Sequence, residues 1–119
     1  MVTTAQDLAD ALIGSPASDY VRMVADWLHR VAKDPQADMT TRPRLTGHII
    51  ADALAAAAAA HVCFSRGEAV PRWTTEPQRR TETLWYPGPA VLMPNALVHT
   101  PLSFSVRGLL IEADSLESV

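Results

Sequence analysis

The sequence predicts a mainly α-helical protein. Three N-terminal helices form a bundle around a long Ala-rich helix, and a proline-rich aromatic loop and a small C-terminal helix/strand appendage follow. Eight of the ten residues from 51 to 60 are alanine, the strongest helix former. Apolar residues upstream recur at helical spacing. Five prolines between residues 65 and 94 exclude long regular elements from that stretch.

The first helix is predicted from about Thr4 to Ile13. Thr4 and Asp7 have the spacing of a capping box, and Gly14 is a typical helix stop. An amphipathic stripe supports the helix: Leu8, Ala11 and Leu12.

The second helix is predicted from Ser15 to about Lys33. Ser15 suits the N-cap, Pro16 the first helical position, and Asp19 the positive end of the helix dipole. Its apolar face follows helical spacing: Tyr20, Val24, Trp27, Leu28 and Val31. A loop is expected after it, since Asp34-Pro35 and Arg42-Pro43 disfavour helix.

The third helix is predicted from Pro43 to Phe64, with Pro43 in its first turn. Because alanine side chains are small, neighbouring elements can approach this helix closely, so we expect it at the centre of the fold. Charged and imidazole groups interrupt the apolar run, which argues against a membrane span: Arg44, His48, Asp52 and His61.

The proline-rich stretch from 65 to 94 carries large aromatic side chains. Trp73, Trp85 and Tyr86 are expected to anchor an ordered loop over the helical core or over a partner. Residues 81–86 fit either a short strand or a helical turn.

Short elements are predicted in the C-terminal third: a helix over Pro94–His99, a turn from Thr100-Pro101 through Phe104, a break at Arg107-Gly108 and a buried strand over Leu109–Ile111. The acidic tail that follows is expected to be exposed, with Leu116 docked on the core.

Length and composition bound the function. With 119 residues the chain is expected to be one domain, 1–119, divided into a helical core (1–64), the loop (65–94) and the appendage (95–119). A net charge of −3 argues against strong nonspecific nucleic-acid binding. Cys63 is the only cysteine, which excludes an internal disulfide and fits a cytoplasmic location. The N-terminus lacks the pattern of a secretory signal.

The usual signs of catalysis are missing, so no enzyme activity, cofactor or metal site is expected. His48 and His61 project about 140° apart on one helix and are too far separated to share an ion. His61 and Cys63 are two residues apart, which does not place them on one face. Common phosphate-binding and hydrolase motifs are absent.

A basic cluster, Arg72, Arg79 and Arg80, lies beside Trp73. Basic and aromatic residues together can bind nucleic acid, and they also dominate protein–protein hot spots. Three glutamates are mixed into the same stretch: Glu68, Glu76 and Glu82. A solvated loop with aromatic packing is the simplest interpretation, and protein–protein contact is the next.

Residues 96–111, ALVHTPLSFSVRGLLI, resemble the C-terminal segment of small actinobacterial antitoxin-type proteins encoded beside nucleotidyltransferase-like toxins. In those proteins an Ala-Leu-Val-[His/Glu]-[Ser/Thr]-Pro run precedes a Phe, an Arg-rich turn and a short apolar strand. The matching positions are Ala96, Leu97, Val98, His99, Thr100, Pro101, Phe104, Arg107, Gly108, Leu109, Leu110 and Ile111. Pro71 with Trp73, and Trp85-Tyr86-Pro87, resemble the aromatic-proline pattern of that group. The usual run of arginines is reduced here to Arg107, and the N-terminal half shows no helix-turn-helix.

The resemblance implies a non-enzymatic protein that docks on a cognate toxin and occludes its active site. Trp73, Trp85 and Tyr86 are the expected anchors of contact. Charge complementarity is expected from the remaining site residues: Arg107, Glu112, Asp114 and Glu117. The carboxylates would pair with basic residues of a nucleotide-binding pocket, in place of phosphate.

Two other functions remain open. A basic stripe on the second helix, or the Arg79-Arg80 pair, would favour a DNA-binding regulator. A pocket between the Ala-rich helix and the Trp-bearing loop would favour a small-molecule-binding or enzymatic domain. An exposed Ala-rich face would in addition favour a homodimer.

Overall fold

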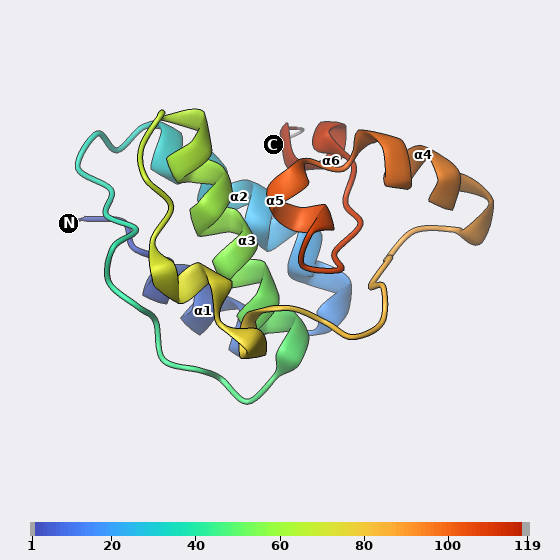
Figure 1. The fold of residues 1–119 in the computed structure, drawn as a ribbon, viewed down its shortest axis with the longest axis horizontal. Coiled ribbons are helices and arrows are strands. Elements are labelled where there is room, and N and C mark those ends of the chain that lie inside the picture. The colour runs from blue at the N-terminus through green and yellow to red at the C-terminus, as the bar shows by residue number, and fades with distance from the viewer. Residues whose placement is uncertain (1, 118–119) are drawn as a thin grey trace.

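In the computed structural model, which describes residues 2–117 except the side chain of Glu117, helices pack around one central helix (Figure 1). The mainly α-helical fold is confirmed, and no strand occurs within the described residues. The α-helices are α1 (Ala5–Ile13), α2 (Tyr20–Ala32), α3 (Ile49–Ser65), α4 (Met93–His99), α5 (Leu102–Ser105) and α6 (Ala113–Glu117). Four 3₁₀ turns join them: η1 (Ala17–Asp19), η2 (Arg72–Thr75), η3 (Pro77–Arg79) and η4 (Ala90–Leu92).

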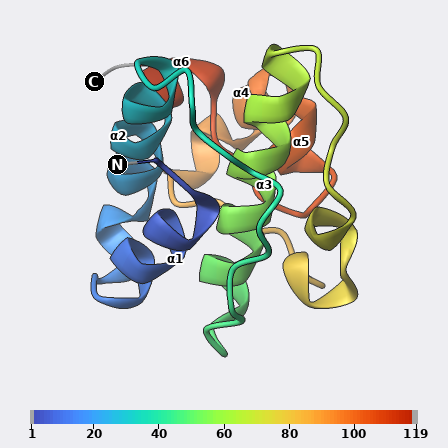
Figure 2. The same ribbon diagram turned by 90° about the vertical axis from the view of Figure 1, so that its left-hand side faces the viewer.

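Helix α3 is the centre of the fold, as the alanines predicted. All ten residues from 51 to 60 are buried. Helices α1, α2 and α5 and the turns η2 and η3 all contact α3, and Figure 2 shows α3 running between the α1–α2 pair and the helices α4 and α5. The alanines are covered within the chain itself, so they present no face for a helix–helix dimer.

Helix α3 begins six residues later than predicted, at Ile49 instead of Pro43. Asp52 explains the difference. Its Oδ1 accepts hydrogen bonds from the backbone N–H and the hydroxyl of Thr46, each at 2.8 Å, and these bonds hold Thr46 outside the helix. Gly47 has a φ of +82°, which turns the chain out of the helix. His48 becomes the N-cap, and its Nδ1 accepts from the Ala51 N–H.

The first two helices follow the sequence pattern closely. Thr4 caps α1, where its N–H donates to the Asp7 carboxylate at 2.9 Å, and Gly14 ends the helix. Pro16 starts the turn η1, so the α-helical geometry of α2 begins four residues later than expected. Trp27 of α2 is fully buried, and its Nε1–H donates to the Thr4 carbonyl at 3.0 Å. This bond ties α2 to the start of α1.

Residues 104–116 contribute to the core, which corrects the prediction that the whole C-terminal segment is an appendage. Phe104, Leu109, Ile111 and Leu116 are buried in the same cluster as the N-terminal helices, and α6 lies on α2. The predicted strand over residues 109–111 is reduced to a single parallel bridge between Trp85 and Leu109. Residues 81–86 form neither the short strand nor the helical turn that was expected, and Trp85 makes only this isolated bridge.

Two smaller predictions can be checked at α4 and α5. The short helix at Pro94–His99 is confirmed, with α4 starting one residue earlier. Pro101, not Thr100, is the N-cap of α5, because the Thr100 hydroxyl instead donates to the Ala96 carbonyl in α4. None of the described helices has the length and apolar character needed to cross a membrane.

Candidate functional site

Trp73, expected at a partner interface, lies in the core of the protein. Its side chain is only 7% exposed, and its Nε1–H donates to the Met39 carbonyl at 2.9 Å. The Arg79 guanidinium lies 5.0 Å from the ring centroid. These contacts fasten the proline-rich loop to the core, and they leave the Trp73 ring little surface for a partner.

Arg107 is also buried, at 8% exposure. Its Nε and Nη2 donate to the Thr74 carbonyl at 3.1 and 3.0 Å, and its Nη1 donates to the Ser103 carbonyl at 2.7 Å. Burial lowers the pKa of the guanidinium. The side chain therefore joins the end of α5 to η2, close to Trp73.

Trp85 and Tyr86 are half-buried and adjacent in sequence. The Trp85 ring packs against the core, with its centroid 6.3 Å from that of Tyr20. Trp85 also pairs its backbone with the C-terminal segment, where its N–H donates to the Gly108 carbonyl at 2.8 Å. Trp85 thus has internal contacts, and part of each ring remains accessible.

Glu112 and Asp114 lie beside α4, away from the buried pair Trp73 and Arg107. Together with Asn95, His99 and Ala113 they line a hollow of about 310 Å³. Glu112 is half-buried and Asp114 is exposed. The Glu117 side chain lies outside the described part of the chain. The six of the seven predicted contact residues whose side chains are described therefore do not form one surface.

A different surface stands out, which we call the apolar arm: residues 90–102, comprising η4, α4 and the turn into α5. Figure 1 shows it at one end of the long axis of the molecule, away from α1. Among the α-helices and turns, only η4 has extensive contact with α4. Five of the thirteen large apolar side chains that are exposed in the described chain belong to the arm: Val91, Leu92, Leu97, Val98 and Leu102.

The sequence shows this arm only indirectly. The run AVLMPNALVH is strongly apolar, which is equally consistent with a buried segment. In the structure, Ala96 is the one buried residue of the seven in α4 (Met93–His99). The sequence analysis placed partner contact on aromatic side chains and therefore did not identify the arm as a surface.

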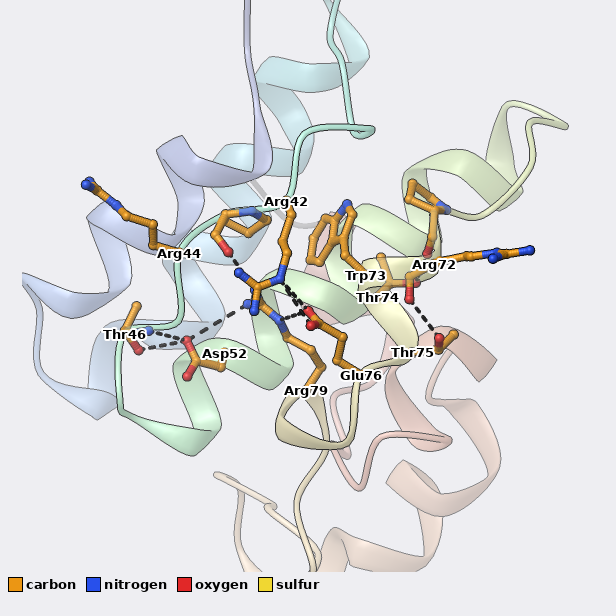
Figure 3. Close-up of polar contacts among 12 residues, drawn as sticks. Arg42, Arg44, Thr46, Asp52, Arg72, Trp73, Thr74, Thr75, Glu76 and Arg79 are labelled. Carbon is orange, nitrogen blue, oxygen red and sulfur yellow. Dashed lines mark hydrogen bonds and ion pairs between the residues drawn. The ribbon is translucent and has the colours of Figure 1, made fainter.

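A buried ion network connects the loop before α3 with the turn η3 (Figure 3). Arg79 is fully buried and donates from Nη2 to the Pro43 carbonyl at 2.7 Å. Its Nε lies 3.5 Å from Glu76 Oε1, and its Nη1 lies 4.0 Å from Asp52 Oδ1. Arg42 closes the network with a bidentate contact to Glu76, at 2.8 and 3.1 Å.

The charges in this network shift each other's proton affinities. The hydrogen bond from Arg42 lowers the pKa of Glu76, and Arg79 adds to the effect. Burial lowers the pKa of Arg79, while Asp52 and Glu76 oppose that shift. The network holds three segments of the chain together, so we assign it a structural role. Since Arg79 is buried, it is not available to a DNA backbone.

A cavity of about 440 Å³ lies on the α2–α6 side of α3. Its walls include Leu28, Val62 and Leu116, with His29 and Arg66 at its edge. Arg66 is engaged with the end of α2, where its Nη2 donates to the carbonyls of Val31 and Asp34 at 3.0 Å. This cavity is on the opposite side of α3 from η2, so it is not the pocket that was expected beside the Trp-bearing loop.

The candidate nucleophile and metal ligands are separated. Burial raises the pKa of the Cys63 thiol, which disfavours the reactive thiolate. His48 caps α3 and stacks edge-on against Tyr20, whereas the His61 ring lies near Phe104. Within residues 2–117 no three His, Cys, Asp or Glu side chains gather as a metal site would require.

Comparison with models of protein families, with curated proteins and with solved structures gave no match.

Proposed function

We propose that this chain is an antitoxin-type protein that binds a cognate toxin through the apolar arm and occludes the toxin's active site. The observation that carries the proposal is the exposure of Val91 in η4 and of Leu97 and Val98 in α4, at one end of the molecule. Contiguous exposed apolar side chains are typical of protein–protein interaction sites. Covering them on a partner would remove apolar surface from water, which is the main driving force for association.

The charges beside the arm restrict the partner. Glu112 and Asp114 border α4 next to Asn95 and His99. Neither α4 nor α6 contains an Arg or Lys, so this edge of the arm is acidic. A complementary partner would present an apolar patch flanked by basic residues. A nucleotidyltransferase-like toxin would supply the basic residues, since its active site must hold phosphates.

The resemblance of residues 96–111 to antitoxin-type proteins supports the same partner, since this segment contains the second half of α4 and all of α5. In this proposal the chain is not an enzyme and acts in the cytoplasm. A DNA-binding regulator has less support. Arg79 is buried, and Arg22 on α2 lies between Asp19 and Asp26, at 3.5 and 3.8 Å.

The test is a tagged pull-down from the native cell with mass spectrometry of the eluted proteins. We expect one stoichiometric partner encoded by a neighbouring gene, and we expect Val98→Asp to abolish its recovery. Val98 is 77% exposed, so the substitution leaves the core intact.

Phe64→Asp is the matched control, because Phe64 is 74% exposed at the end of α3, outside the arm. This variant should recover the partner as the wild type does. The proposal fails if no stoichiometric partner elutes, or if the two variants lose it equally. Inhibition of the partner's activity by the purified chain would then test the antitoxin role itself.

A further inference from the structure

Arg107 carries a buried positive charge without a carboxylate partner. Within the described residues no carboxylate oxygen lies within 4.0 Å of its guanidinium, and its acceptors are the Thr74 and Ser103 carbonyls. Buried charges in proteins are generally paired or bound to ions. Arg79, the other buried arginine, has two carboxylates beside it. Arg107 therefore differs from Arg79 in lacking a counter-charge.

A small cavity lies against this unpaired charge. It measures about 160 Å³, comparable to the roughly 150 Å³ cavity that admits benzene in another protein. We call it the arginine pocket. Its lining is made of Thr74, Thr75, Glu76, Arg79, Arg80, Val106 and Arg107.

The charge balance of the arginine pocket is positive. Three arginine residues line it, against the single acidic residue Glu76. That carboxylate is already held by Arg42 at 2.8 Å and faces Arg79 at 3.5 Å. Arg80 is exposed and makes no hydrogen bond or ion pair with the rest of the described chain. The charges of Arg80 and Arg107 are thus left without compensation from the protein.

Donor groups for an anion are also present. A guanidinium has five N–H donors. Backbone carbonyls accept from one N–H on each of the three guanidinium nitrogens of Arg107. Two of its five N–H donors are therefore left, one on each Nη. Arg80 also lines the pocket, is exposed, and has all five of its N–H donors available. Planar guanidinium forks suit bidentate binding of phosphate or carboxylate oxygens.

We propose that the arginine pocket binds a phosphate-type oxyanion between Arg107 and Arg80. The group is either free phosphate or the phosphate of a mononucleotide. This site lies on residues 74–80 and 106–107, apart from the apolar arm, so it does not rest on the proposed partner binding and either proposal can fail alone.

The experiment titrates the ¹⁵N-labelled full chain with inorganic phosphate and, in parallel, with AMP, at constant ionic strength set with chloride. Saturable shifts are expected at the amides of Thr75, Arg80 and Arg107. Substituting Arg80→Gln should weaken phosphate binding about tenfold, which corresponds to about 1.4 kcal/mol. Arg80 is exposed, so this variant should keep the fold.

Arg72→Gln is the matched control, since Arg72 is another exposed arginine of the same loop and does not line the pocket. It should bind phosphate as the wild type does. Equal saturation by phosphate and AMP would support a free-phosphate site, and at least tenfold tighter binding of AMP would support a nucleotide phosphate. Shifts that do not saturate, that occur away from the arginine pocket, or that weaken equally in the two variants would overturn the proposal.

Discussion

Helix α3 and the apolar arm are both apolar, yet they have opposite places in the structure. Residues 51–60 of α3 are buried without exception, whereas Val91 and Val98 of the arm are among the most exposed side chains of the described chain. The difference follows from side-chain size and helix length. Alanines let neighbours approach α3 from several sides, while α4 has seven residues and turns only Ala96 inward. Apolar character alone therefore did not decide burial.

The largest effect is expected where the core around α3 loses a large side chain. Trp27→Ala should lower the free energy of unfolding by about 3–5 kcal/mol, the usual range for a fully buried aromatic residue. It also leaves the Thr4 carbonyl without its donor. Urea unfolding followed by circular dichroism measures the change. A loss below about 1 kcal/mol would contradict the central position of this contact.

A second change adds volume to α3. Ala57 is fully buried, and Ala57→Leu should destabilise the fold by about 1–3 kcal/mol because the surrounding helices have no space for three more carbons. Differential scanning calorimetry of this variant beside Ala57→Gly separates overpacking from loss of helix propensity. An unchanged melting temperature for the leucine variant would show that α3 is less tightly enclosed than described.

The pair Arg42–Glu76 attaches the proline-rich loop to the loop that precedes α3, and this attachment is sensitive to acid. The pKa of Glu76 is lowered in the folded protein from its ordinary value of 4.5. Its stabilising contribution is therefore complete above pH 4.5 and is lost as the pH falls through the folded-state pKa. We expect Glu76→Gln to unfold more easily at neutral pH and to lose less stability on acidification.

Urea unfolding at a series of pH values from ~7 to ~3 checks this prediction. Glu82→Gln is the control, because Glu82 is exposed and should keep the wild-type pH profile. A Glu76→Gln profile parallel to that of the wild type would rule out this contribution.

The smallest effect on stability is expected in the arm. Val98→Asp should change the free energy of unfolding by no more than about 0.5 kcal/mol, as is usual for exposed positions. The same variant should remove partner binding. Thermal unfolding and partner recovery measured on one preparation give both numbers, and a destabilisation comparable to that of Trp27→Ala would place the arm in the core.

The sequence predicted local structure better than it predicted burial in the loops. The cap at Thr4, the stop at Gly14 and the central role of the alanines depend on neighbouring residues, so they are visible in the pattern. The late start of α3 could not be predicted from the pattern. Composition alone allows a helix from Pro43, but the hydrogen bonds from Thr46 to Asp52 compete with it.

The candidate site depended even more on contacts between distant residues. Trp73 is surrounded in sequence by proline and charged residues, and its burial follows from a hydrogen bond to Met39, 34 positions away. Arg79 is buried because Pro43 and Asp52 come to it from another part of the chain. Side chains that resembled surface anchors in the sequence therefore became internal ones, and the exposed apolar residues of α4 took their place as the candidate contact surface.

Amide hydrogen exchange, with and without the captured partner, tests this contrast most directly. In the free chain, residues 51–60 should exchange slowly and residues 93–99 quickly, since α4 has few contacts with the core. Binding of the partner should slow exchange in residues 90–102 and leave α3 unchanged. Slowed exchange elsewhere, with the arm still exchanging quickly, would contradict the account.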